Sequence, residues 1–477
     1  MSKIGFKGRA LAALSAVALL AAMAPGTALA EPGSRYTSDI TINGVDSGAT
    51  ITAYEIVDAI VDSNNQLSYT YANGVDESTY KNLVSNSTEM KAAVGTIATG
   101  IASGSVTPIN TQTKIATGGS VVFSDLDDGA WLFVVTNANG STKVYQNTVV
   151  NNTPKVDGLN YAANPQTADV KSDDGPTPDK TVGTGNDHST SAYQIGDSVP
   201  FTITAAIPNY PSNYANPTFT ISDAPNAGLI DDVSSIVVQA NGVDVANVPA
   251  NYAVTASGNG FKLAFTADFI KSHLGQTITV KYNAKLTSDA FKIVGDGTKN
   301  SMTLEYSNSP DTTHTSDPVK DDVNTYGFYF QKVDGSNNAL AGAEFTLYNA
   351  DGSAPIVDEN GQPLKSTADA NGYVWFEDLA DGKTYTLKET KVPAGKQAVA
   401  DFKVTIDKAK ATLDNPATNG ITEANYQKYT DDNTVIDPDQ SLLPVTGGPG
   451  TLALTVAGVI LMAGGVAVVV RSRRRSE

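Results

Sequence analysis

The sequence predicts an all-β protein built from tandem antiparallel β-sandwich domains. The 477-residue chain is rich in Thr, Val, Tyr, Asn and Gly, and apolar and polar residues alternate in short runs, for example at 120–123, 199–204, 277–282 and 402–406. Turn residues separate these runs, and short strands between turns are typical of sandwiches. One segment, 76–101, has partly helical spacing of its apolar residues and is expected to be an insertion on a β domain.

The two ends of the chain have the composition of processing segments. Residues 1–30 join a basic start to an apolar run and end in Ala28-Leu29-Ala30, which is typical of a cleaved secretory signal peptide. Residues 451–470 form an uncharged stretch that is long enough, at about 1.5 Å per helical residue, to cross a ~30 Å hydrocarbon core as a transmembrane helix. The basic tail 471–477 follows it, so the tail is expected to be cytoplasmic and the preceding chain to lie outside the cell.

Two polar segments between these ends predict domain boundaries. Residues 171–178 and 308–322 lack the apolar alternation of their flanks, and the first is also interrupted by prolines. The expected domains therefore span 31–175, 176–322 and 323–440.

Charge and composition exclude several classes of function. The formal net charge of −18 disfavours binding to nucleic acid or to anionic lipid. The chain has no cysteine, although an extracellular location permits disulfides, and its three histidines, His188, His273 and His314, are scattered. No cofactor and no metal site are expected, and the G-x-S-x-G and H-E-x-x-H motifs of hydrolases are absent from the sequence.

A pentapeptide before the apolar stretch carries the first family resemblance. Leu443-Pro444-Val445-Thr446-Gly447 precedes the membrane span and the basic tail, and this order resembles the L-P-x-T-G cell-wall sorting signal of Gram-positive surface proteins. The resemblance implies that a sortase cleaves between Thr446 and Gly447 and holds the Thr446 acyl group until an amine accepts it. It also implies attachment to peptidoglycan.

The third expected domain carries a second resemblance. It contains Tyr329-Phe330-Gln331-Lys332-Val333-Asp334 near its start and a Y-x-L-x-E-T-x-x-P-x-G element over 385–395. These motifs resemble the Cna B-type immunoglobulin-like domain of Gram-positive adhesins and pilins. The family forms an intramolecular isopeptide bond, so the resemblance implies Lys332 as nucleophile, Glu389 as proton shuttle and Asp437 as acceptor, with Asn433 as the alternative acceptor.

Physical chemistry explains why that reaction needs these residue types. Burial removes the solvation of a lysine and shifts it toward the neutral, nucleophilic amine. A buried carboxyl that stays protonated polarises the carbonyl under attack. The amide persists because water does not return easily to a dry core.

The middle domain has a similar set of residues. It opens with Pro178-Asp179-Lys180, continues with Phe219-Thr220-Ile221-Ser222-Asp223 and closes with an N-x-x-x-L-x-Y-S-N-x-P strand over 300–310. This pattern resembles the Cna A-type middle domain of Spa-type major pilins. The resemblance implies Lys180 as nucleophile, Asp223 as acid and Asn300 as acceptor, with Asn308 as the alternative acceptor.

The first domain extends the resemblance to nearly the whole mature chain. Residues 39–44 and 48–56 resemble the N-terminal domain of the same pilins, which are the shaft subunits of sortase-assembled pili. A polymer also needs an amine that accepts the Thr446 acyl group, and the family's V-x-x-Y-P-K motif is not literally present. Lys171, just before a proline-broken acidic segment that is not expected to join a sheet, is the predicted inter-subunit lysine; Lys155 is the alternative.

The resemblance implies a structural protein rather than an enzyme, because its internal lysine reactions are single-turnover self-modifications. Expected partners are sortase, further copies of the chain in a head-to-tail polymer, tip or base pilins, peptidoglycan, and host matrix or glycans. The expected location is the cell wall, as part of a surface fimbria that supports adhesion. The alternative is a monomeric wall-anchored adhesin or accessory pilin.

Overall fold

The computed structural model describes residues 35–439 apart from 63, 84–87, 159, 292–296, 412–425 and 431. The predicted signal peptide, sorting signal, membrane span and tail lie outside these residues. Within the described part of the chain, no helix combines the length and apolarity needed to cross a membrane. Strands dominate the described residues, which confirms the predicted all-β class.

The chain divides into two compact units. The first contains residues up to Thr190 and Asp197–Asn324, and the second contains Ser191–Gly196 and Thr325 onward. The first unit includes the strands of the first and middle expected domains, and the second includes those of the third. The short segment Ser191–Gly196 groups with the second unit because Ile195 lies in the core of the third sandwich.

The first domain has two main sheets. One has the order β11-β1-β5, and the other has the order β3-β2-β6-β8 with β4 paired to β2. Their bounds are β1 (Thr37–Asn43), β2 (Thr50–Val61), β3 (Leu67–Tyr71), β4 (Thr111–Ile115), β5 (Ser120–Asp127), β6 (Gly129–Thr136), β8 (Thr148–Asn151) and β11 (Gln166–Asp169). One core lies between the sheets and includes Ile40, Ile51, Phe123 and Phe133.

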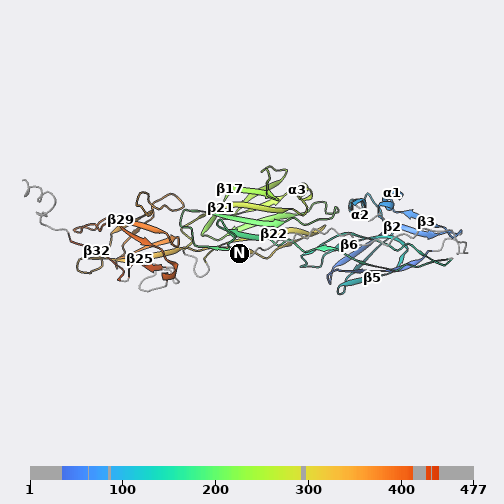
Figure 1. Ribbon diagram of the computed structural model, residues 1–477, viewed down its shortest axis with the longest axis horizontal. Helices are drawn as coiled ribbons and strands as arrows, with labels where there is room; N and C mark the ends of the chain where they lie inside the picture. The colour runs from blue at the N-terminus through green and yellow to red at the C-terminus, as the bar shows by residue number, and fades with distance from the viewer. Residues whose placement is uncertain are drawn as a thin grey trace, which may run out of the picture. The chain divides into compact units, whose positions relative to one another are not determined.

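Two helices cover the outer side of the β2–β6 sheet, as Figure 1 shows. They are α1 (Glu77–Leu83) and α2 (Thr88–Ser103), in the region where the sequence predicted a helical insertion. Two short ladders complete the domain: β7 (Val144–Tyr145) pairs with β12 (Ser172–Asp173), and β9 (Lys155–Asp157) pairs with β10 (Asn160–Ala162).

The middle domain is a sandwich of a five-stranded and a seven-stranded sheet. The first has the order β13-β15-β21-β17-β18, and the second has β14-β24-β22-β16-β20-β19 with β23 on β22. Their bounds are β13 (Asp179–Val182), β14 (Ser189–Thr190), β15 (Ser198–Ala206), β16 (Phe219–Pro225), β17 (Leu229–Ala240), β18 (Val243–Asp244), β19 (Tyr252–Ser257), β20 (Gly260–Phe265), β21 (Thr277–Leu286), β22 (Thr298–Ser309), β23 (Thr312–Thr315) and β24 (Val319–Val323), with helix α3 (Ala267–Ser272) after β20.

Strict alternation of buried and exposed side chains explains why these strands form. Along β15, every second residue from Val199 to Ala205 is buried and the residues between them are more exposed, as a period of two requires. Phe261 of one sheet meets Tyr282 of the other edge to face, with ring centroids 5.0 Å apart. Large aromatic side chains therefore fill the space between the sheets.

The third domain is a sandwich of two four-stranded sheets. One contains β28-β25-β31 with β32 paired to β25, and the other has the order β27-β26-β29-β30. Their bounds are β25 (Tyr326–Asp334), β26 (Glu344–Tyr348), β27 (Lys365–Thr367), β28 (Tyr373–Leu379), β29 (Thr384–Lys391), β30 (Phe402–Thr405), β31 (Tyr426–Lys428) and β32 (Thr434–Asp437), with a short 3₁₀ helix at Lys408–Lys410. Phe330 and Phe345 meet across the sandwich at 5.1 Å between ring centroids.

The structure places strands in both polar segments that the sequence analysis interpreted as domain boundaries. Residues 308–322 hold the end of β22, all of β23 and most of β24, and Ser172–Asp173 forms β12. Backbone ladders do not require apolar side chains on both faces, so polarity alone misidentified these strands as connections.

Candidate functional site

The first candidate site lies in the third sandwich, near the C-terminal ends of β25 and β32. Strands β25 and β32 run parallel, with Lys332 opposite Val435 and Asp334 opposite Asp437. This register places the side chains of Lys332 and Asp437 together in the core, where both residues are 0% exposed. The Lys332 ammonium is in direct contact with the Asp437 carboxylate, and its Nζ donates to the Val435 carbonyl at 3.3 Å.

Glu389 reaches the same site from the facing sheet, on β29. Its Oε2 accepts a hydrogen bond from the Val399 amide at 3.0 Å, and its Oε1 is buried. The pKa of Glu389 is raised to about 7, mainly by burial and in part by the neighbouring Asp437 carboxyl. A carboxyl with a pKa near neutrality can both give and accept a proton, as an acid–base group must.

The alternative acceptor, Asn433, is used differently. It has a left-handed backbone, with φ of 52°, in the turn before β32. Its side-chain oxygen accepts from the Tyr429 amide at 2.9 Å, and its own amide donates to Thr430 Oγ1 at 3.1 Å. The structure thus engages Asn433 in a turn, whereas it places Asp437 against Lys332.

The second candidate site lies between the two sheets of the middle sandwich. Lys180 comes from β13 in one sheet and Asp223 from β16 in the other. The Lys180 Nζ lies 2.6 Å and 2.7 Å from the two carboxylate oxygens of Asp223, and the two residues are 0% and 2% exposed. Burial lowers the pKa of Lys180 and raises that of Asp223, so it favours proton transfer from the ammonium to the carboxylate.

Tyr282 connects this pair to Asn300. The Tyr282 hydroxyl donates to Asp223 Oδ2 and accepts from Asn300 Nδ2 at 3.1 Å. Asn300 is 0% exposed, and its Oδ1 has no hydrogen-bond partner among the described residues. The structure therefore joins all three predicted residues in one network, through a tyrosine that the sequence analysis did not identify.

Two further buried carboxyls were also missed. Asp231 Oδ1 lies 3.4 Å from Asn300 Nδ2, and burial raises the pKa of Asp231 to about 8, with the Asp223 charge adding to the shift. Asp321 lies opposite Asn300 in the β22–β24 ladder and bonds to His188 Nδ1 at 3.1 Å. Burial raises the pKa of Asp321 to about 6.

The alternative acceptor of the middle domain, Asn308, lies at the other end of β22. Its Oδ1 accepts from Thr312 Oγ1 at 2.7 Å, and its Nδ2 donates to the Ser141 carbonyl at 2.8 Å. The bond to Ser141 ties the end of β22 to the first domain. Asn308 is therefore separated from Lys180 along the strand, whereas Asn300 lies in the Tyr282 network.

The predicted inter-subunit lysine is more enclosed than expected. Lys171 immediately precedes β12, and its carbonyl accepts from the Gln146 amide at 2.8 Å. Its Nζ is buried without a hydrogen-bond partner among the described residues, and burial lowers its pKa. The expectation that this segment stays out of a sheet is wrong, because β12 pairs with β7. Lys155, the alternative, is exposed on β9.

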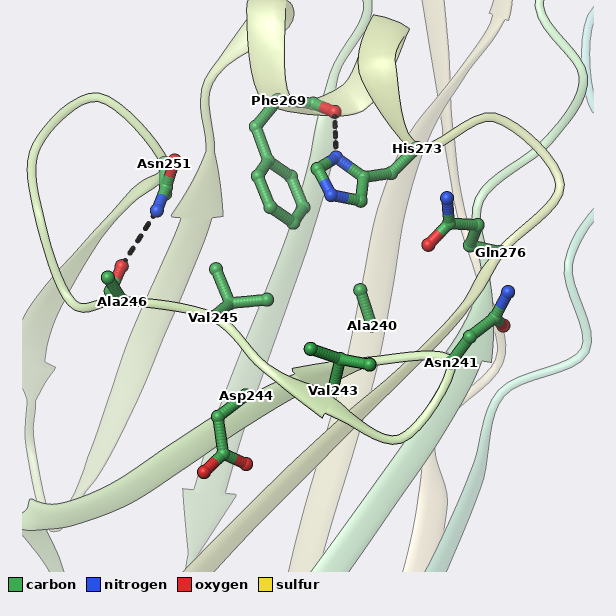
Figure 2. Close-up of a pocket in the computed structure, with 10 residues that line it drawn as sticks. All are labelled: Ala240, Asn241, Val243, Asp244, Val245, Ala246, Asn251, Phe269, His273 and Gln276. Atoms are coloured by element: carbon green, nitrogen blue, oxygen red, sulfur yellow. Dashed lines mark hydrogen bonds between the residues drawn. The ribbon is translucent and has the colours of Figure 1, made fainter.

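A surface pocket is separate from both lysine sites. The β17–β18 hairpin and α3 enclose about 420 Å³ on the middle sandwich, and Figure 2 shows Val243, Val245 and Phe269 along its apolar side. His273 stacks on Phe269 with ring centroids 3.9 Å apart. None of the predicted site residues lines this pocket. Among the described residues, no group of three or more potential ligands could hold a metal ion.

The first domain contains a buried carboxyl of its own. Glu55 on β2 is 0% exposed, and neither of its carboxyl oxygens has a hydrogen-bond partner among the described residues. The pKa of Glu55 is raised to about 8, mainly by burial and in part by the charges of Asp58 and Asp127. Folding therefore favours the protonated form of Glu55 at neutral pH.

We expect Glu55→Gln to stabilise the first domain at high pH. The folded state binds the Glu55 proton more tightly than the unfolded state, so wild-type stability falls as pH rises from about 4.5 to about 8. An uncharged amide removes this dependence, and at pH 8 the gain is expected to be about 2–4 kcal/mol. Amide hydrogen exchange of β2 and β6 at pH 5 and pH 8 measures it. An unchanged pH dependence in the variant would contradict the assignment.

Two family models match the chain. Residues 327–420 match the SpaA prealbumin-like fold domain, and residues 438–477 match the LPXTG cell wall anchor motif. The second match includes the predicted sorting signal, span and basic tail. The chain is therefore a cell-wall-anchored surface protein, as predicted.

Similarity to known proteins extends over most of the chain. It is 25% identical over 465 residues to the trypsin-resistant surface T6 protein of Streptococcus pyogenes serotype M6, covering 88% of this chain and 82% of that protein. It is 31% identical over 180 residues to fimbrial subunit type 1 of Actinomyces viscosus, covering 33% and 30%. These findings support the prediction of a sortase-assembled backbone pilin with a structural role.

Solved structures agree on the fold. The T6 backbone pilin of S. pyogenes serotype M6 superposes with a TM-score of 0.58 at 21% identity, covering 87% of this chain and all of that one. The full-length RrgB pilus protein of Streptococcus pneumoniae superposes with a TM-score of 0.51 at 16% identity, covering 89% of this chain and all of that one. The modular sandwich architecture is thus shared with pilus proteins.

Proposed function

We propose that this protein is the repeating shaft subunit of a covalent pilus, joined head to tail by amide bonds between Thr446 of one copy and Lys171 of the next. The observation that carries the proposal is the similarity over 88% of the chain to the T6 surface protein, together with the wall anchor at the C-terminus. Tip or base pilins and host matrix or glycans are the further partners that a shaft of this kind would have.

The linkage chemistry needs no cofactor. A sortase cysteine displaces Gly447, so the Thr446–Gly447 amide breaks and the Thr446 acyl group becomes a thioester. The neutral amine of Lys171 then attacks this thioester, and the cysteine leaves as the amide forms. Burial favours the neutral amine of Lys171, but the β7–β12 ladder beside it must open to admit the acyl group.

The same proposal assigns an internal cross-link to each of the two lysine sites. Lys332 joins to Asp437 with loss of water, and Lys180 joins to Asn300 with loss of ammonia. Contact of Lys332 with Asp437 and the Lys180–Asp223–Tyr282–Asn300 network support these assignments. Glu389 and Asp223 act as the proton shuttles.

Thr446→Ala is expected to abolish covalent attachment to the cell wall, because it alters the residue whose carbonyl the sortase attacks. The variant should remain in the membrane fraction and be released by detergent. Wild-type protein should need a peptidoglycan hydrolase for release, which immunoblots of the two fractions measure. Thr451→Ala, a similar change outside the pentapeptide, is the control. Covalent attachment of Thr446→Ala at the wild-type level would contradict the sorting assignment.

The second candidate function is a monomeric wall-anchored adhesin. The absence of a literal V-x-x-Y-P-K motif and the enclosed amine of Lys171 favour it. Both functions share the sorting step, so a high-molecular-weight ladder on denaturing gels of wall extracts distinguishes them. Wild-type extracts without a ladder would favour the adhesin.

A further inference from the structure

We propose that Asp231 is a second catalytic residue of the Lys180–Asn300 condensation, which protonates the departing amide nitrogen of Asn300 while Asp223 accepts a proton from Lys180. The inference rests on the cross-link proposed above and deepens it. A single carboxyl was expected to perform both proton transfers. The structure instead places one carboxyl at each reacting nitrogen.

The contacts assign the acceptance of the Lys180 proton to Asp223 and the protonation of Asn300 to Asp231. Asp223 holds the Lys180 ammonium through both of its oxygens, at 2.6 Å and 2.7 Å. Asp231 comes from β17, in the opposite sheet from Asn300, and its Oδ1 lies 3.4 Å from Asn300 Nδ2. Asp231 is 7% exposed, and its Oδ2 is buried without a hydrogen-bond partner among the described residues. Burying an unpaired carboxylate costs far more free energy than burying the neutral acid.

The strand pattern shows that this burial is built into the fold. Along the start of β17, Leu229 and Asp231 face inward while Ile230 and Asp232 are exposed. Asp231 thus occupies a core position that the alternation would give to an apolar residue. A carboxylate that forms a surface salt bridge or caps a turn does not need a core position. The Asp231 carboxyl instead interacts with Lys180, Tyr282 and Asp223 of the same buried network.

The protons balance with two carboxyls. Lys180 begins as an ammonium, Asp223 as a carboxylate and Asp231 as a carboxylic acid. Asp223 takes the first proton, and the neutral amine attacks the Asn300 side-chain carbonyl carbon. Asp231 gives its proton to Nδ2, the C–N bond breaks and ammonia leaves. The second proton of the attacking nitrogen then returns Asp231 to the acid form, so the amide, ammonia and two neutral carboxyls remain.

Other charged groups near this network have separate roles. Asp321 lies opposite Asn300 in the ladder, where one of its oxygens bonds to His188 and its charge also acts on Lys180. Tyr282 bridges Asp223 and Asn300, and burial raises its pKa well above the ordinary value. Tyr282 therefore stays protonated, and the carboxyls that titrate around Asn300 are Asp223, Asp231 and Asp321.

The test is the rate at which the cross-link forms in the full-length chain. Cell-free synthesis is pulse-labelled and chased at a set pH, and mass spectrometry of proteolytic peptides quantifies the Lys180–Asn300 product over time. Loss of a general acid typically slows a reaction 10²–10⁴-fold, so Asp231→Asn is expected to form the product at least about 10²-fold more slowly. Asp231→Glu should recover part of the rate. The wild-type rate should fall above about pH 8, where Asp231 ionises, and Asp231→Asn should lack this decline.

Two matched controls make the result specific. Asp232→Asn makes the same change at the neighbouring exposed residue, and Asp321→Asn removes a buried carboxyl that pairs with His188 instead. Both should cross-link much faster than Asp231→Asn. Formation of the Lys332–Asp437 product in the same molecules reports that each variant was made and that its third domain folded.

The outcomes distinguish failure of the role of Asp231 from failure of the Lys180–Asn300 cross-link itself. Cross-linking of Asp231→Asn at the wild-type rate would overturn the role of Asp231, as would an equally slow Asp321→Asn variant or failure of Asp231→Glu to exceed Asp231→Asn. Absence of the Lys180–Asn300 product from wild-type protein would instead overturn the cross-link itself.

Discussion

Glu389→Ala is expected to leave the third domain folded but without its Lys332–Asp437 bond. Glu389 is the proposed acid–base group at this site, and without it the lysine and aspartate are expected to remain an ion pair. Relative to the mass of each mature sequence, wild type should then be about 35 Da lighter, because the Lys332–Asp437 bond releases water (about 18 Da) and the Lys180–Asn300 bond releases ammonia (about 17 Da). The variant should be only about 17 Da lighter, since it lacks the first condensation. Intact-mass measurement of the two proteins checks this result.

The same variant should lose much of the domain's stability. The bond closes a loop of about 100 residues, and for such a loop the chain-entropy estimate gives about 4–5 kcal/mol of unfolding free energy. Thermal unfolding and trypsin resistance measure the loss. Bond formation in wild type should also slow as pH rises above about 7, because Glu389 then ionises.

Glu344→Ala is the control for this experiment. Glu344 lies on β26 of the same sheet, but its carboxylate pairs with Lys365 at 3.0 Å and is partly exposed. This variant keeps the proposed acid–base group of the lysine site, so it should retain the wild-type deficit of about 35 Da from both condensations. A wild-type mass equal to that of the sequence, or a Glu389→Ala variant that still loses water, would contradict the proposed chemistry.

Lys171→Ala is expected to abolish the pilus ladder while the monomer stays anchored to the wall and keeps both internal cross-links. The variant removes the amine that accepts the Thr446 acyl group, so sortase would transfer each copy to peptidoglycan instead. Denaturing gels of hydrolase-treated wall measure the ladder. Burial of the Lys171 amine is compatible with this role because β7 and β12 are each two residues long, and a ladder of so few backbone hydrogen bonds opens at a lower free-energy cost than a long one.

Lys155→Ala is the matched control for the polymer experiment. Lys155 lies on the exposed hairpin of β9 and β10, so its loss should leave the ladder unchanged. Loss of the ladder in Lys155→Ala alone would show that Lys155 is the linking residue. A ladder that survives both substitutions would remove the main mechanistic support for the shaft-subunit proposal.

Much of the fold could be predicted from the sequence because two-residue alternation is a local signal. The run at 277–282 became β21, in which Ile278, Val280 and Tyr282 all face the core. The residues of the lysine sites were predicted from motifs, and the structure places Lys332 against Asp437 and Lys180 against Asp223. Polar strands such as β23 and β24 were missed because their pairing with β22 depends on register rather than on composition.

The missed site residues share a signal that was present in the sequence. Asp231 follows Leu229 by two residues and Asp321 precedes Val323 by two, so each carboxyl is in phase with apolar positions of its strand. Asp223 shows the same phase relative to Phe219 and Ile221. A charged residue on the apolar phase of a strand predicts burial. Its partner could not be predicted in the same way, because that depends on the packing of two sheets.

The positions of the two proposed cross-links also determine how a pilus would carry tension. Pulling force that enters at Lys171 and leaves at Thr446 would cross from Lys180 to Asn300 and from Lys332 to Asp437 through covalent bonds. The strands between each pair of linked residues would then bear almost none of it, and neither would the first sandwich, which precedes Lys171 in the chain. Such a fibre would resist stretching even while its first domain unfolds and refolds.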